Sequence, residues 1–132
     1  MTVAVAHQVS ATARIALAQA VQEARYRETD LAVLHVVNTA LDADTEESYR
    51  LGVSDEIERA VGSEPELVWK LHLRAVKGDV GDALVDLTNR MKPDLLVLGA
   101  RRRSPVGKAL MGSVAQTIIL DASVPVLVVK TA

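Results

Sequence analysis

Four stretches of apolar residues, each the length of one β-strand, limit the folds that this chain can adopt. They are Val3 to Ala6, Leu31 to Val37, Leu95 to Leu98 and Val124 to Val129. A strand that is apolar almost throughout is buried on both faces, which is typical of parallel sheets covered by helices. The chain is therefore expected to build its fold around such a sheet.

Segments with helical spacing of apolar residues lie between these strands. Three of them carry apolar residues three or four positions apart: Leu17, Val21 and Ala24; Leu84, Leu87 and Met91; Leu110, Val114 and Ile118. That spacing places one apolar stripe on each helix, which can pack on a sheet. Ser10 and Asp79 are predicted N-caps, and Pro93 predicts the end of the helix before it.

The middle of the chain has weaker signals. Ser48 to Val61 is predicted to form the second helix, and the acidic segment Asp42 to Glu47 is interpreted as a solvated loop or as a helix start. From Leu67 to Val76 apolar and polar residues alternate, which indicates a half-exposed strand at the edge of the sheet. The full order is βαβαβαβαβ. We predict an α/β fold with a single doubly wound domain over residues 1–132, a five-stranded parallel sheet and four helices.

The composition argues against several kinds of site. Without cysteine the chain has no disulfide and no thiolate metal site, which suits a cytoplasmic location. A formal net charge of -2 argues against general nucleic-acid binding, and no apolar run is long enough for a membrane span. The three histidines lack metal-ligand spacing, so we predict no metal site. His35, inside an apolar strand, is interpreted as a core histidine with satisfied hydrogen bonds.

The loop after the fourth strand has the chemistry of an anion site. In open parallel sheets ligands bind beyond the carboxyl ends of the strands, where the winding direction reverses, so the loops after strands one and four are candidates. The second loop runs from Gly99 to Ser113 and contains Arg101 to Arg103. Glycines, free amides at a helix start and basic side chains all suit phosphate. A solvated basic loop, with Gly112 as a tight helix entry and Ser113 as its cap, is the alternative.

The loop matches neither the Walker pattern nor Gly-x-Gly-x-x-Gly. It resembles instead the universal stress proteins, whose ATP-binding members carry Gly-x-x-Gly, nine residues, then Gly-Ser or Gly-Thr. Gly99, Gly112 and Ser113 occupy those places. The resemblance extends over the whole chain, through Leu34 to Val37, Gly78-Asp79, Asp94 to Gly99 and Val124 to Val129. It implies a Rossmann-like fold of the adenine nucleotide alpha hydrolase type.

The resemblance also implies a cytosolic regulator in stress response that binds ATP or AMP, with Mg²⁺ only through the nucleotide. The implied nucleotide-binding residues are Ala4, Val5, Ala6, Val36, Val37, Leu98, Gly99, Arg101, Arg102, Gly112, Ser113, Val114 and Ala115. Two positions depart from the family pattern. Arg102 stands in place of the second glycine, and Ala6 falls where nucleotide-binding members have an aspartate. A nucleotide-free interaction module of the same fold is the alternative.

The last strand is predicted to pair two copies of the chain. It is very apolar for a sheet edge, and such edges usually find a partner or a cover. The resemblance implies the same homodimer interface, formed by Val124, Pro125, Val126, Leu127, Val128 and Val129. A further protein partner is expected but not identified. No catalytic residues are predicted, because no nucleophile elbow and no paired carboxylates are present; slow ATP hydrolysis is left open.

Overall fold

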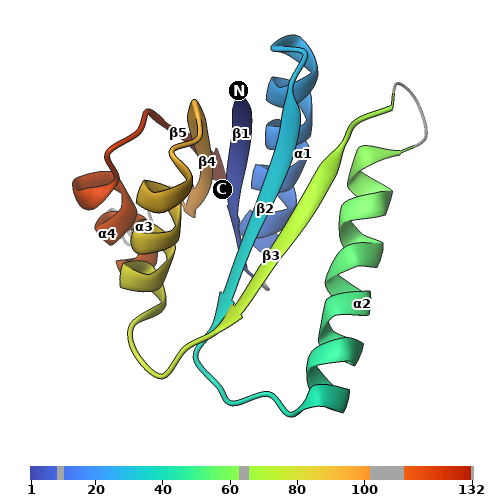
Figure 1. The fold of residues 1–132 in the computed structure, drawn as a ribbon. Helices are drawn as coiled ribbons and strands as arrows, with labels where there is room; N and C mark the ends of the chain where they lie inside the picture. Colours follow the sequence, from blue (N-terminus) through green and yellow to red (C-terminus); the bar gives the residue numbers. More distant parts are fainter. Residues whose placement is uncertain (9–10, 63–65, 102–111, 132) are drawn as a thin grey trace.

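In the part of the chain that the structure describes, five parallel strands form one sheet (Figure 1). The structure is a computed structural model that describes residues 1–8, 11–62, 66–101 and 112–131. The strands are β1 (Thr2–His7), β2 (Asp30–Val37), β3 (Trp69–Ala75), β4 (Leu95–Arg101) and β5 (Val126–Thr131). The helices are α1 (Ala11–Tyr26), α2 (Ala43–Val61), α3 (Val80–Met91) and α4 (Ser113–Asp121). The predicted α/β class, five-stranded parallel sheet and four helices are confirmed.

The sheet lies between two helical layers, with α1 and α2 on one face and α3 and α4 on the other (Figure 1). Successive side chains of a strand point to opposite faces, so β1 contributes to both cores. Val3 and Val5 pack in the cluster beneath α1 and α2, while Ala4 and Ala6 pack in the cluster beneath α3. This two-sided burial is why the strands are apolar almost throughout.

The strand order β3-β2-β1-β4-β5 shows that the winding direction reverses between β1 and β4. The chain winds outward from β1 to β3 and then returns to the other side of β1 for β4 and β5. As predicted, β3 is an edge strand: Leu71 and Leu73 are buried, whereas Lys70 and Arg74 on its other side are exposed. The second edge is β5, which is paired with β4.

Helix α2 begins earlier than predicted. The interpretation of Asp42 to Glu47 as a solvated loop is wrong, and the alternative of a helix start is confirmed. Asp42 is the N-cap, and its side chain accepts a hydrogen bond of 2.7 Å from the Thr45 N–H. Asp44 and Glu46 lie in the first turn, where negative charge is stabilised by the helix dipole. The acidic residues are therefore part of what starts the helix.

The boundaries of α3 follow the predicted signals. The Asp79 side chain caps the helix by accepting a hydrogen bond of 2.9 Å from the Asp82 N–H. The helix ends at Met91, and Lys92 takes the left-handed conformation with φ 49° immediately before Pro93. The predicted cap at Ser10 lies outside the described residues. None of the helices in the described ranges is long and apolar enough to cross a membrane.

One side chain joins the ends of α3 and α4. Asn89 of α3 accepts hydrogen bonds of 2.9 Å from both the N–H and the hydroxyl of Ser123. Its amide nitrogen lies 3.4 Å from the Asp121 carbonyl, which it meets as a donor. These contacts attach the carboxyl end of α4, and the turn into β5, to the last turns of α3.

Gly99 of β4 allows α1 to lie directly against the sheet. A Cβ atom added at Gly99 would be 2.6 Å from the Thr12 carbonyl oxygen, which belongs to the α1 backbone. That separation is well inside van der Waals contact, so a methyl group there displaces either the helix or the strand. Packing alone therefore requires glycine at this position.

We predict that Gly99→Ala lowers the free energy of unfolding by about 1–3 kcal/mol, because the added methyl group overpacks the contact with α1. The matched control is Gly52→Ala in α2, where no described atom lies within 4 Å of an added Cβ. That variant should gain up to about 1 kcal/mol from helix propensity. Urea unfolding measures both. A Gly99→Ala protein as stable as the parent would contradict the close contact between α1 and β4.

Candidate functional site

The carboxyl ends of β1 and β4 lie side by side where the winding reverses, as the sequence predicted for a ligand site. Ala6 is paired in register with Leu98, and Gly99 follows on β4. Among the predicted residues of β1, Ala4 and Val5 are fully buried within the strand and Ala6 packs in the apolar cluster beneath α3. Their side chains therefore belong to the core, and only their backbone is relevant to a ligand.

The amino end of α4 brings amides without a helical acceptor to the same edge of the sheet. Gly112 is the N-cap and offers no side-chain hydrogen bond, and the first helical bond runs from the Gln116 N–H to the Gly112 carbonyl, at 3.0 Å. The N–H groups of Ser113, Val114 and Ala115 precede that bond and have no acceptor inside the helix. The alternative interpretation of Ser113 as the cap is wrong, because Ser113 is the first residue of α4.

Gly112 differs from Gly99 in its surroundings. Its φ of -57° and ψ of 154° suit any residue, and among the described residues no atom lies within 4 Å of an added Cβ. Neither backbone strain nor crowding by the described residues explains this glycine. Arg101 ends β4, whereas Arg102, with the rest of the predicted loop up to residue 111, lies outside the described residues.

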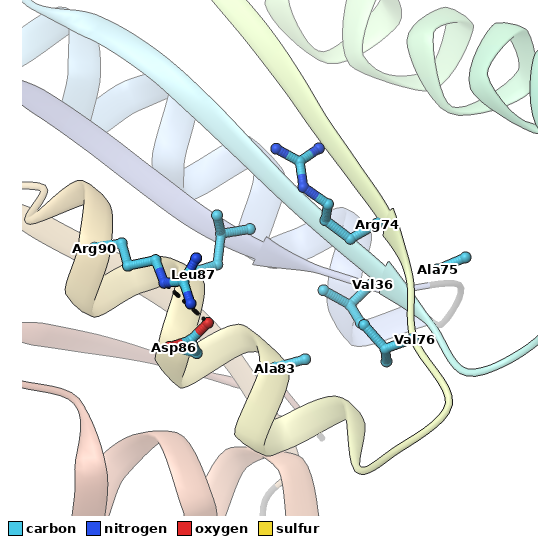
Figure 2. A pocket seen from close by; sticks show the side chains of 8 residues that line it. All are labelled: Val36, Arg74, Ala75, Val76, Ala83, Asp86, Leu87 and Arg90. Atoms are coloured by element: carbon cyan, nitrogen blue, oxygen red, sulfur yellow. Dashed lines mark ion pairs between the residues drawn. The ribbon is translucent and has the colours of Figure 1, made fainter.

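A pocket of about 210 Å³ opens between α3 and the ends of β2 and β3 (Figure 2). Its lining residues are Val36, Arg74, Ala75, Val76, Ala83, Asp86, Leu87 and Arg90. Apolar side chains from β2 and α3 line it beside two arginines, one of which is paired with Asp86 at 3.2 Å. It lies on the α3 side of the sheet, the side to which α4 also belongs. Of the predicted residues, Val36 lines this pocket and Val37 does not.

Two buried histidines form a polar cluster that the sequence analysis did not foresee. His7 and His35 are the paired last and third-last residues of β1 and β2, and both are almost fully buried. Their Nδ1 atoms are 2.8 Å apart. From α2, the Tyr49 hydroxyl lies 2.8 Å from His35 Nε2 and Glu56 Oε1 lies 3.3 Å from His7 Nε2.

The interpretation of His35 as a core histidine with satisfied hydrogen bonds is confirmed, but its partnership with His7 was missed. A signal was present, because both histidines stand near the carboxyl ends of predicted strands. Tyr49 and Glu56 are seven positions apart, which places them on one side of a helix. In the described residues, no group of three or more His, Cys, Asp or Glu is arranged to hold a metal ion.

Burial controls the charge of His35. Desolvation, followed by the neighbouring His7, lowers the pKa of His35 from 6.5 to about 4, and Glu56 opposes that shift. Burial also raises the pKa of the Tyr49 hydroxyl, which keeps it protonated at neutral pH. On β3 the pKa of His72 is lowered by burial and by the charges of Lys70 and Arg74.

We predict that the protein loses stability as the pH falls from 6.5 toward 4. The folded state disfavours charged His35, so the unfolded chain binds more protons in this pH range. The contribution of neutral, buried His35 to the free energy of unfolding is therefore fully present only above pH 6.5. The expected loss is on the order of 3 kcal/mol. Urea unfolding at a series of pH values measures it. His72→Gln is the control, and most of the pH dependence should persist in it. An unchanged free energy of unfolding over this range would contradict the buried state of His35.

Comparison with known proteins agrees with this arrangement. The model of the universal stress protein family matches residues 1–130. A universal stress protein of Mycolicibacterium smegmatis is 35% identical over 118 residues, which are 89% of this chain and 88% of the relative. A universal stress protein structure from Archaeoglobus fulgidus aligns with a TM-score of 0.72 and 29% identity, covering 96% of each chain. A universal stress protein in complex with cAMP aligns with a TM-score of 0.69 and 26% identity, covering 100% of this chain and 98% of the other. The chain therefore belongs to the universal stress protein family.

Proposed function

We propose that this protein binds an adenine nucleotide, ATP or AMP, at the carboxyl edge of the sheet and acts in this state as a regulator in stress response. The observation that carries the proposal is the amino end of α4. Three N–H groups without helical acceptors follow Gly112, at the carboxyl edge of the sheet where the winding reverses between β1 and β4. A solved relative in complex with cAMP supports an adenine nucleotide as the ligand.

The phosphates would bind at the start of α4. Backbone N–H groups and the positive end of the helix dipole stabilise anions there. The absence of a side chain on Gly112 leaves room for a phosphate oxygen to approach the amides of Ser113 to Ala115. In this proposal Gly99, Arg101 and Arg102 complete the phosphate site from the end of β4. Most contacts are then made by backbone atoms, which side-chain variation does not remove.

The adenine would lie toward the ends of β1 and β2, where Val36 lines the pocket beside α3 (Figure 2). The Val37 carbonyl already accepts a hydrogen bond of 2.8 Å from the Val76 N–H. This bond uses one of the two lone pairs of the Val37 carbonyl oxygen, so an adenine amino group would donate to the same oxygen as the Val76 N–H. Apolar contact with Val36 then carries more of the base recognition than hydrogen bonding does.

We predict that ATP or AMP raises the unfolding temperature in a saturable way and that Gly112→Val abolishes the rise. The expected stabilisation is about 2.7 kcal/mol when the ligand is at a hundred times its Kd. Valine fits the local backbone and its Cβ meets no described atom within 4 Å, but its branches fill the space proposed for phosphate. Thermal unfolding with ATP, ADP, AMP and GTP, each with and without Mg²⁺, measures the effect.

Two controls belong to this experiment. Without nucleotide, Gly112→Val should unfold at nearly the same temperature as the parent, which separates lost binding from lost folding. GTP should give a smaller shift than ATP if the base is read. No shift with any nucleotide at millimolar concentration would overturn the proposal in favour of a nucleotide-free interaction module of the same fold.

We further propose that two copies of the chain pair through β5, that the nucleotide changes which protein the dimer binds, and that the protein works in the cytoplasm. The support for pairing is the free side of β5. The Leu96 N–H bonds to the Pro125 carbonyl at 2.9 Å, and Leu96 is in register with Val126. In a parallel ladder, alternate residues bond to the neighbouring strand, so Val126 and Val128 direct their N–H and carbonyl groups away from β4.

We predict that Val128→Pro converts the dimer to a monomer, because proline removes an N–H from the outer side of β5 without removing one from its ladder with β4. Val128→Thr is the matched control, since it keeps both the N–H and the branched shape, and it should remain dimeric. Sedimentation velocity measures the state of association, and circular dichroism checks that the helices persist. A Val128→Pro protein that still sediments as a dimer would place the interface elsewhere.

A further inference from the structure

The buried histidines belong to a chain of four side chains that crosses from β1 and β2 to α2. Glu56 contacts His7, His7 contacts His35, and His35 contacts Tyr49. The two rings are almost completely buried, whereas the Glu56 side chain is 33% exposed. Each ring nitrogen thus has one partner, and both ends of the chain, Glu56 and Tyr49, are partly exposed to water.

The direction of every hydrogen bond follows from the carboxylate. An ionised Glu56 can only accept, so His7 Nε2 must donate. A neutral His7 then has a bare Nδ1, which requires a proton on His35 Nδ1. His35 Nε2 is consequently bare and accepts from the Tyr49 hydroxyl. With both rings neutral, all donors point from Tyr49 toward Glu56.

A single added proton reverses the inner part of this chain without breaking it. His35 passes its Nδ1 proton across 2.8 Å to Nδ1 of His7, the ring beside Glu56, and that nitrogen now donates to His35 Nδ1. Tyr49 passes its hydroxyl proton to His35 Nε2, takes the added proton from water, and then accepts a hydrogen bond from the new Nε2–H. His35 stays neutral, His7 is cationic beside a carboxylate, and Tyr49 has changed from donor to acceptor.

A second proton has no place in the same geometry. Both Nδ1 atoms would then carry hydrogens at a separation of 2.8 Å, and two cationic rings would be in contact in a buried site. The charged and titratable groups that these rings meet among the described residues are Glu56 and Tyr49 from α2. Arg14 of α1 reaches Glu56 at 3.9 Å and is itself mostly exposed. Across the sheet, His7 is paired with His35, and His35 is paired on its other side with Leu73 of β3, which is apolar.

We propose that His7 and His35 form a buried site for one proton, whose uptake reverses the hydrogen bonds to Tyr49 and so reports pH from the end of β1 to helix α2. None of its four side chains is among the residues proposed to bind the nucleotide. The carboxylate of Glu56 stabilises the added proton on His7. The reversal of hydrogen bonds reaches Tyr49 because His35 changes from one neutral tautomer to the other, with no movement of heavy atoms.

Long-range ¹H–¹⁵N spectra of the histidine rings test this directly. At neutral pH we expect His7 as the Nε2–H tautomer and His35 as the less common Nδ1–H tautomer. On acidification His7 should become imidazolium while His35, in the same step, changes to its neutral Nε2–H tautomer. The proposal is overturned by an Nε2–H tautomer of His35 at neutral pH, by a charged His35 before His7, or by two neutral rings down to the pH of unfolding.

Glu56→Gln tests the role of the counter-charge. The midpoint of proton uptake by His7 should fall by roughly 1 pH unit or more, because an opposite charge at this distance favours the charged ring. Glu58→Gln, on an exposed position of the same helix, is the control and should leave the midpoint in place. Tyr49→Phe should keep the midpoint close to that of the parent while removing the hydroxyl that reports the change. A midpoint unaffected by Glu56→Gln would overturn the proposal. A dispersed backbone ¹H–¹⁵N spectrum of each variant shows that the variant has folded.

Discussion

Burial of the central strands on both faces is the constraint on which the rest of this structure depends. β1 lies between β2 and β4 and contributes side chains to both cores, so its residues from Val3 to Ala6 have almost no exposed surface. An unpaired polar group is costly in such a place. Polar side chains therefore lie mainly toward the ends of the strands, and the two buried histidines are tolerated because they bond to each other and to α2.

The sequence was sufficient for the fold because apolar runs and helical spacing report burial residue by residue. It was insufficient for the histidine cluster, since His7 and His35 meet only through the register of β1 and β2, and Tyr49 and Glu56 approach them only once α2 is placed. The first residue of α2 could not be predicted, because its acidic composition suits a loop and a helical first turn equally well. β4 and α4 lie where the sequence predicted them, and Arg102 falls outside the described residues.

Gly99 and Gly112 show that two glycines of one sequence pattern can have different physical causes. At Gly99 the backbone of α1 is too close for a methyl group, so the fold itself accounts for the residue. At Gly112 the described residues neither crowd the backbone nor strain it. Spacing alone cannot separate these cases, because it records where a glycine stands and not what lies beside it. The proposed anion-binding role would account for the second glycine.

The hydrogen bonds of Asn89 have a consequence for the far end of α4. They hold the turn after Asp121 to α3, while Ile118 is buried in the core one turn earlier. A helix of nine residues is about 13 Å long, and it is stiff over that length. The direction in which its first amides point thus depends on how its last turn is fastened as well as on the packing of Ala115 near its start. A substitution at Asn89, on the neighbouring helix α3, would therefore act on those amides from the other end of α4.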